Sequence, residues 1–317
     1  MAEKKIYRIT PKLCQRIWGG DGLAPFGKCG GNCLGDRIGE SWELSFVSGS
    51  EATVGGLPLS RAIPRSEWGE RAARFERFPV LTKFIDARES LSVQVHPSDE
   101  YAREQEGDLG KCEMWYVVSA ESGAGVYLGP SREVTREELR LRAESGSLEE
   151  ILRFVPVASG DVIYIPAGTI HSICGGVLVY EIQESSDITY RLYDYMRRDG
   201  EGRLRELHLD RALDVACLKP YEDPPRVKLS EDIMAVCDYF EARKCKLNFT
   251  KSTYFVDKSS FVAVTCVEGS ASLDGEPVSL GDTLFVPAGY GEFTLEGCGT
   301  LLLVSVPERF ERTDLIE

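Results

Sequence analysis

Two of the three histidines in this 317-residue chain stand in patterns that suit metal binding. His171 follows a Pro-Ala-Gly turn in the pattern G-x5-P-x-G-x2-H, which places an imidazole just past a tight turn at a strand end. His96 ends the alternating segment LSVQVHP. Because strand side chains alternate, Gln94 and His96 share one face, which is the interior if Val93 and Val95 face outward.

A lysine and a glutamate add to this set. Lys111 and Glu113 in GKCEMWYVV also share a face, so Cys112 between them should point away. Taken singly, these residues fit structural roles, such as a hydrogen-bonded histidine or a salt-bridged glutamate. Together, two imidazoles, one carboxylate and one amide oxygen form a donor set for a first-row divalent ion. The third histidine, His208, lies in a charged helical pattern and is interpreted as a surface or capping residue.

The segments that must position these residues are short and rich in Val, Ile, Tyr and Phe, with Gly, Pro, Asp or Ser between them. Many short strands and few helices favour an antiparallel sandwich or barrel over a parallel α/β sheet. The predicted strands include Val80–Ile85, Leu91–His96, Met114–Ser119, Asp161–Ile165, Val177–Ile182 and Thr283–Val286.

Helical patterns are few. Thr135 with Glu138, and Ser147 with Glu150, form capping-box patterns that predict short helical segments over about 135–154. A further helix is expected over about 204–217. The prolines that follow predict a linker at 220–225.

An internal repeat suggests two copies of one architectural unit. Residues 160–168 read GDVIYIPAG and residues 281–289 read GDTLFVPAG. Three residues after the last glycine, the first copy has His171 and the second has Glu292. We therefore predict a catalytic domain over 1–219 and a second β domain over 226–317 that binds no metal and covers apolar surface of the first.

Composition narrows the class of protein. Lys and Arg total 37 against 51 Asp and Glu, giving a net charge of −14 that disfavours nonspecific binding to nucleic acid or anionic membranes. No apolar run could span a bilayer, and the first residues lack the apolar core of a secretion signal. A cytoplasmic location is expected. Most of the ten cysteines lie in or beside apolar stretches, and Cys29 and Cys33 lie in a glycine-rich loop, so all are expected to be reduced thiols.

The ordered motifs resemble those of a known family. The pattern at His171 resembles the second cupin motif, and QVH followed by a glutamate resembles a modified first motif. The whole order over residues 5–217 resembles the compact bacterial form of type I mannose-6-phosphate isomerase. The motifs are RIWGG (16–20), GESWELS (39–45), LTKFIDA (81–87), LSVQVHP (91–97), GKCEMWYV (110–117), IPAGTIHSI (165–173) and SSDITYRLYDY (185–195).

The resemblance implies a fold, an activity and a cofactor. The fold is mainly β, with two cupin-like jelly-roll β-barrels and a small helical portion. The activity interconverts mannose 6-phosphate and fructose 6-phosphate through an enediol(ate), with one zinc ion per chain and a small phosphosugar as substrate. By the family pattern, the zinc ligands are Gln94, His96, Glu113 and His171.

The same resemblance implies roles for two cations. The active-site arginine of the family matches Arg191, and Lys111 matches a pocket lysine that transfers a proton or anchors the substrate. From the residues alone, these two roles of Lys111 stay open. Alternation places Thr189, Arg191 and Tyr193 on one face. The phosphate could be bound by any of Lys83, Lys111, Arg191, Arg197 and Arg198.

Two other functions fit part of this pattern. Two histidines and a carboxylate also describe the facial triad of non-haem Fe(II) oxygenases. Against this stand Gln94 as a fourth ligand and the cations Lys111 and Arg191, which suit a phosphosugar. A non-catalytic phosphosugar-binding cupin is the other alternative, since a fold does not determine a function.

Overall fold

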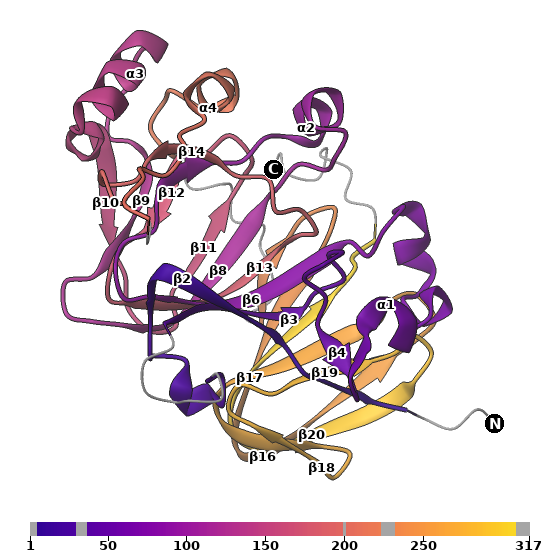
Figure 1. The fold of residues 1–317 in the computed structure, drawn as a ribbon. Helices are drawn as coiled ribbons and strands as arrows, with labels where there is room; N and C mark the ends of the chain where they lie inside the picture. The colour runs from indigo at the N-terminus through magenta and orange to yellow at the C-terminus, as the bar shows by residue number, and fades with distance from the viewer. Residues whose placement is uncertain (1–4, 30–36, 199–200, 223–231, 309–317) are drawn as a thin grey trace.

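The computed structural model describes residues 5–29, 37–198, 201–222 and 232–308, and three β-sheets dominate it (Figure 1). The middle sheet has the order β11-β8-β13-β6-β3-β2, and the helix-side sheet has the order β10-β9-β12-β7-β14. The C-terminal sheet has the order β1-β19-β17-β20-β16-β15, with β18 beside β17. The chain is therefore mainly β, as predicted, and the described strands form facing sheets that are compatible with the predicted jelly-roll architecture.

The bounds of the strands are as follows. The middle sheet contains β2 (Lys12–Gly20), β3 (Ile38–Leu44), β6 (Val80–Ala87), β8 (Glu113–Ala120), β11 (Val162–Ile165) and β13 (Val177–Glu184). The helix-side sheet contains β7 (Val93–Val95), β9 (Gly125–Pro130), β10 (Leu152–Pro156), β12 (His171–Ile173) and β14 (Tyr190–Tyr193). The C-terminal sheet contains β1 (Tyr7–Ile9), β15 (Ile233–Val236), β16 (Glu241–Val256), β17 (Val262–Leu273), β18 (Glu276–Ser279), β19 (Thr283–Val286) and β20 (Gly291–Ser305), and β4 (Thr53–Val54) pairs separately with β5 (Leu57–Pro58).

The middle sheet is buried on both faces. Every residue of β6 and of β13 is buried. Phe84 and Tyr180 pack toward the C-terminal sheet, whereas Ile85 and Val179 pack toward the helix-side sheet. A strand covered on both sides needs apolar residues at consecutive positions, which explains the unbroken apolar runs in these segments.

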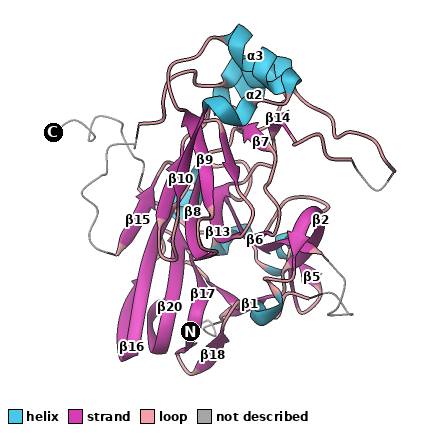
Figure 2. Ribbon diagram, turned by 90° about the vertical axis from the view of Figure 1, so that its left-hand side faces the viewer, coloured by secondary structure: helices cyan, strands magenta, loops and turns pink. Residues whose placement is uncertain are grey.

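Helices cover the outer face of the helix-side sheet (Figures 1 and 2). Helix α3 (Arg136–Ser145) begins at Thr135, whose side chain accepts a hydrogen bond from the Glu138 amide, so the predicted N-cap is confirmed. The Glu138 carboxylate pairs with Arg132 and does not complete a capping box. The segment after Ser147 forms only a 3-10 turn, η4 (Leu148–Ile151), without a side-chain cap. The third predicted helix is shorter than expected, since α4 spans Leu209–Val215.

The other helical segments are short. They are α1 (Leu59–Ala62), α2 (Asp99–Gln105), and the 3-10 turns η1 (Ala24–Phe26), η2 (Arg65–Glu67) and η3 (Glu70–Arg74). No helix within the described ranges is long and apolar enough to cross a membrane.

The two copies of the repeat have the same backbone form. β11 and β19 each follow a Gly-Asp turn and precede a Pro-Ala-Gly turn. The glycines that open the two copies, Gly160 and Gly281, have φ of +93° and +87°. The closing glycines, Gly168 and Gly289, have φ of +85° and +79°. These left-handed conformations require glycine, which explains why the repeat retains all four.

The C-terminal sheet packs against the middle sheet and includes a strand from the other end of the chain. Strand β1 pairs with β19, with Tyr7 opposite Phe285. A hydrogen bond of 2.7 Å joins the hydroxyls of Tyr180 and Thr265 across the two sheets. The two halves therefore share one apolar core, and the N-terminal strand crosses the boundary that we predicted at residue 219. Residues 223–225 of the predicted linker lie outside the described residues, as does Cys33.

Candidate metal centre and cavity

Strand β7 carries the first two predicted metal ligands toward the middle sheet. Val93 and Val95 are fully buried among the apolar side chains of α3 and α4 on the outer side. Alternation therefore turns Gln94 and the next residue but one, His96, to the inner side. Gln94 is half-buried and His96 is buried.

The turn before β12 brings the second histidine to the same place. β12 pairs with β7 so that His171 lies opposite Gln94. The amide of Gly168 donates to the carbonyl of His96 over 2.8 Å, which links the turn to the end of β7. A Cβ atom at Gly168 would lie 3.0 Å from the carbonyl oxygen of Val215, so both the space and the φ angle favour glycine.

The carboxylate comes from the facing sheet. Glu113 is the first residue of β8 and is completely buried. Its oxygens lie 3.4 Å from Nε2 of His96 and 3.3 Å from Nε2 of His171. Nε2 of His171 also lies 3.3 Å from the amide of Gln94. All four predicted ligands are thus brought together between the two sheets.

Hydrogen bonds leave the inner nitrogens of both imidazoles turned toward the carboxylate. Nδ1 of His96 contacts the carbonyl of Ile188 at 2.8 Å, and Nδ1 of His171 contacts the carbonyl of Thr169 at 2.9 Å. Nδ1 therefore carries the proton, and Nε2 is left with a free lone pair. Within the described part of the chain, Nε2 of His96 and both oxygens of Glu113 accept no hydrogen bond. A divalent cation would satisfy these buried atoms, and His96, Glu113 and His171 are close enough to hold one.

The electrostatics of the cluster favour neutral imidazoles and an ionised carboxylate. Burial, reinforced by the Lys111 ammonium, lowers the pKa of His96 to about 3. Burial also lowers the pKa of His171. Burial alone would raise the pKa of Glu113, but Lys111 and the two imidazoles outweigh it and hold that pKa well below its usual range. These are the protonation states that metal ligands need.

A cavity of about 520 Å³ opens beside the cluster. Lys111 and Gln94 line it and also contact the cluster, since Nζ of Lys111 lies 3.0 Å from Glu113. A row of inner-face residues crosses four strands of the middle sheet: Trp42 opposite Lys83, Lys83 opposite Glu181, and Glu181 opposite Trp115. The predicted substrate residues Lys83 and Lys111 are therefore both in the cavity wall.

Glu181 is a site residue that sequence reasoning missed. Its Oε1 lies 3.3 Å from Nζ of Lys83 and 3.9 Å from Nζ of Lys111, and its Oε2 accepts from the Trp115 indole over 3.1 Å. Burial and the nearby Glu113 raise the pKa of Glu181. Burial alone would lower the pKa of Lys111, but Glu113 and Glu181 raise it. Glu181 shares a face with Val179. Counting alternate residues from a predicted ligand across the paired strands would have placed Glu181 on the cavity face.

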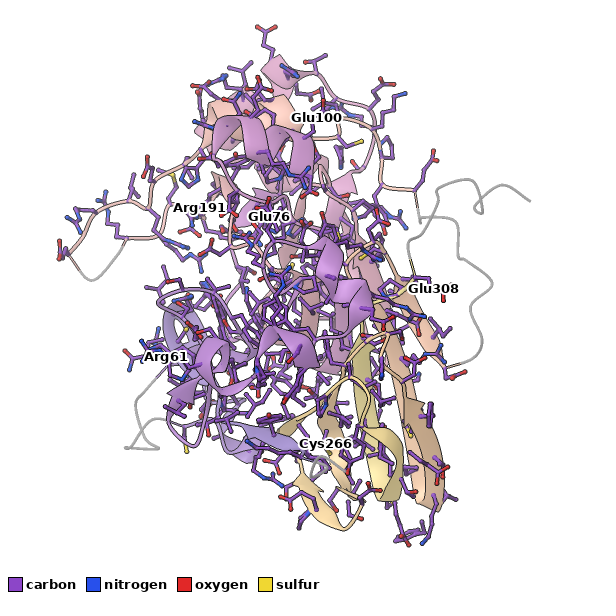
Figure 3. All side chains as sticks on the ribbon, turned by 90° about the vertical axis from the view of Figure 1, so that its right-hand side faces the viewer. Arg61, Glu76, Glu100, Arg191, Cys266 and Glu308 are labelled. Carbon is purple, nitrogen blue, oxygen red and sulfur yellow. The ribbon has the colours of Figure 1, made fainter. Side chains whose placement is uncertain are left out.

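Arg191 also lines the cavity, from β14 of the helix-side sheet (Figure 3). Its guanidinium donates to the carbonyl of Glu206 over 2.7 Å, and among the described residues it forms no ion pair with a carboxylate. Burial and the nearby Arg205 lower its pKa. The nearby carboxylate of Asp194 pairs with Arg197 and Arg205 instead.

Two sequence interpretations concern the surroundings of Arg191. A register shift between Arg191 and Tyr193 places Tyr193 in the outer apolar core, so the predicted alternation is wrong there. His208 occupies the N-cap position of α4, which agrees with its interpretation as a capping residue, but its side chain caps no helix amide. Its Nδ1 instead accepts from the Arg191 amide over 3.1 Å, and its own amide donates to the Arg191 carbonyl over 2.8 Å. His208 therefore fixes the backbone that carries Arg191.

The phosphate candidates divide into two groups. Lys83, Lys111 and Arg191 line the cavity, whereas Arg197 and Arg198 do not. Two further arginines in the wall were missed by sequence reasoning. They are Arg205, from the loop before α4, and Arg16, which pairs with Glu40 at 2.7 Å.

The depressed pKa of His96 predicts how the stability of the metal-free protein depends on pH. The imidazole titrates near 6.5 when unfolded and near 3 when folded, so between these values the unfolded chain binds the additional proton. Lowering the pH from 7 to 5 should reduce the free energy of unfolding by about 2 kcal/mol through this residue. Urea unfolding at both pH values measures it. His96→Gln should shrink the loss, whereas an equal loss in wild type and His96→Gln would contradict the assignment.

Comparison with known proteins places this geometry in a family. Residues 230–306 match the model of the mannose-6-phosphate isomerase cupin domain. The chain is 38% identical over 306 residues to mannose-6-phosphate isomerase ManA of Bacillus subtilis, covering 91% of this chain and 95% of that protein.

Two solved structures extend the comparison to the fold. A mannose 6-phosphate isomerase from Bacillus subtilis superposes with a TM-score of 0.82 at 32% identity, covering 95% of this chain and 99% of that one. A mannose 6-phosphate isomerase bound with zinc and yttrium superposes with a TM-score of 0.73 at 16% identity, covering 94% and 98%, and so shares the fold. From the identity to ManA over nearly its whole length, the chain belongs to the mannose-6-phosphate isomerase family.

Proposed function

We propose that the protein interconverts D-mannose 6-phosphate and D-fructose 6-phosphate, with one zinc ion per chain, in the cytoplasm. The observation that carries this proposal is the contact between a buried metal-capable cluster and a cation-lined cavity through Lys111 and Gln94. A phosphosugar needs both features, since the cations bind the phosphate and the metal activates the sugar end. The relatives in the family carry the same activity in their names.

The residues that would hold the zinc ion are His96, Glu113, His171 and Gln94. The two histidines and Glu113 supply buried nitrogen and oxygen atoms. Rotation of the Gln94 amide would supply its oxygen as a fourth ligand from the cavity side. A zinc-bound structure with this fold supports the choice of metal. A bound divalent ion would withdraw charge from the sugar oxygens and stabilise an enediolate without redox change.

We assign proton transfer between C1 and C2 of the sugar to the pair of Lys111 and Glu181. Both groups line the cavity, and Nζ of Lys111 lies 3.9 Å from Oε1 of Glu181. The protonation of one group changes that of the other, so the two groups titrate together. The raised pKa of Lys111 favours its ammonium form. The raised pKa of Glu181 makes its carboxylate a stronger base than an ordinary glutamate. Glu181 then accepts the proton, while Lys111 holds negative charge that develops on the sugar.

Arg191 is proposed to bind negative charge on the substrate. Its guanidinium lines the cavity without a carboxylate partner among the described residues, and Arg205 adds positive charge beside it. A fork of fixed donors suits a phosphate or an oxyanion better than an ammonium does. Lys83, at the same wall, is proposed as a second substrate contact, with its ammonium 4.5 Å from the centre of the Trp42 ring.

Turnover tests the reaction and its metal together. We expect conversion of mannose 6-phosphate to fructose 6-phosphate in a coupled assay, loss of activity on chelation, and recovery when zinc is added. Glu113→Gln should lower turnover more than about 100-fold, because it removes a charged ligand. Glu51→Gln, at an exposed loop contact to the Ser60 amide, is the matched control.

Other outcomes of this assay identify the alternatives. A fully metal-loaded protein without turnover would overturn the isomerase proposal and favour the binding module. A requirement for iron and oxygen would instead indicate the cupin oxygenase.

Substitution of the cavity arginine tests its role in binding charge. Arg191→Lys keeps the charge but loses the forked donors, so kcat/KM should fall about 10–100-fold. A rise in KM would indicate phosphate binding, and a fall in kcat would indicate stabilisation of the oxyanion. Arg198→Lys is the control, since that guanidinium donates to the carbonyl of Gly202 outside the cavity lining. Equal kinetics for the two variants would contradict a role for Arg191.

A further inference from the structure

Two cysteines from different halves of the chain meet directly behind the metal cluster. Cys112 stands between Lys111 and Glu113, and its side chain turns away from the cavity into the core between the middle and C-terminal sheets. Cys237 follows β15 in the C-terminal half and reaches the same core. Their sulfur atoms lie 3.7 Å apart. Nothing in the isomerase mechanism uses either thiol.

Both thiols are held by anchored backbone and are only partly buried. The carbonyl of Cys112 accepts from the Glu184 amide over 3.0 Å, and the amide of Cys237 donates to the Phe240 carbonyl over 3.0 Å. Burial alone would raise the pKa of Cys237, but the Cys112 thiol and the amides of Tyr239 and Phe240 outweigh it and lower that pKa. A lowered pKa raises the fraction of Cys237 that is present as thiolate, the form that attacks a peroxide.

We propose that Cys112 and Cys237 form a reversible dithiol–disulfide site that a peroxide oxidises. The Cys237 sulfur attacks one oxygen of hydrogen peroxide, the O–O bond breaks, and the departing hydroxide takes up the Cys237 thiol proton and leaves as water, so that Cys237 becomes a sulfenic acid. The Cys112 sulfur then attacks this sulfur, and the hydroxyl leaves with the Cys112 proton as a second water. Two thiols thereby lose two electrons and two protons to one hydrogen peroxide. A small dithiol reverses the step by thiol–disulfide exchange.

Bond formation reaches the metal cluster through the chain itself. The sulfur atoms must approach from 3.7 Å to about 2.0 Å, the length of a disulfide bond. The displacement of Cys112 is passed through single peptide bonds to Lys111 and Glu113. Since a misplacement of about 1 Å in a catalytic group can cost 100-fold in rate, oxidation should lower turnover. This consequence rests on the proposed isomerase function, whereas the disulfide itself does not.

Peroxide treatment of the zinc-loaded full-length protein tests both parts. Peptide mass spectrometry should show Cys112 linked to Cys237, turnover should fall at least about 5-fold, and dithiothreitol should restore it. Cys237→Ser, with Cys237→Ala as a second variant in case the first does not fold, should keep its turnover in peroxide. Cys298→Ser, at an exposed cysteine, is the matched control and should stay sensitive.

Three outcomes would overturn the proposal. Absence of the linked peptide at full oxidation refutes the dithiol site. A linked peptide with undiminished turnover refutes its connection to the metal cluster, and equal inactivation of Cys237→Ser does the same. A linked peptide in a protein that also lacks turnover when reduced and zinc-loaded supports the dithiol site and refutes the isomerase function instead.

Discussion

Burial of the Glu113 carboxylate between two sheets is the constraint on which the structure of the site depends. An ionised carboxylate removed from water is costly unless positive charge compensates it. The Lys111 ammonium at 3.0 Å provides part of that compensation, and two imidazole nitrogens lie within 3.4 Å without protons to offer. A divalent cation would complete the balance. The facing sheets hold these groups in place, because β7 and β12 carry the histidines and β8 carries the glutamate.

The C-terminal sheet supports the sheets that carry the site. The middle sheet presents charged residues to the cavity on one face, and an apolar core covers its other face. The C-terminal sheet covers that face. Strand β1, from the start of the chain, pairs with β19 as part of this sheet. The second repeat copy thus contributes packing where the first contributes ligands. Its freedom from metal stays a prediction, with Glu292 at the position that corresponds to His171.

Local patterns predicted the parts of the site that depend on neighbouring residues in the chain. Three features follow from short-range geometry. They are the alternation along β7, the N-cap at Thr135 and the paired Pro-Ala-Gly turns. The position of Glu181 at the cavity depends on the register between β13 and β6. The orientation of Tyr193 depends on a register shift against β7. Neither can be predicted from the spacing of nearby residues. Pairing of β1 with β19 joins residues at opposite ends of the sequence. Likewise, residues before α4 are not helical because Leu204 bridges to Arg198 and His208 is held by Arg191.

We propose that the buried cluster binds zinc through nitrogen and oxygen atoms from both sheets. X-ray absorption spectroscopy at the zinc edge of the metal-loaded full-length protein measures this coordination. We expect a first shell of nitrogen and oxygen at about 2.0–2.1 Å with outer scattering from two imidazoles, and a changed spectrum in His171→Gln. A sulfur shell at about 2.3 Å, which would assign the metal to the cysteines, would contradict it.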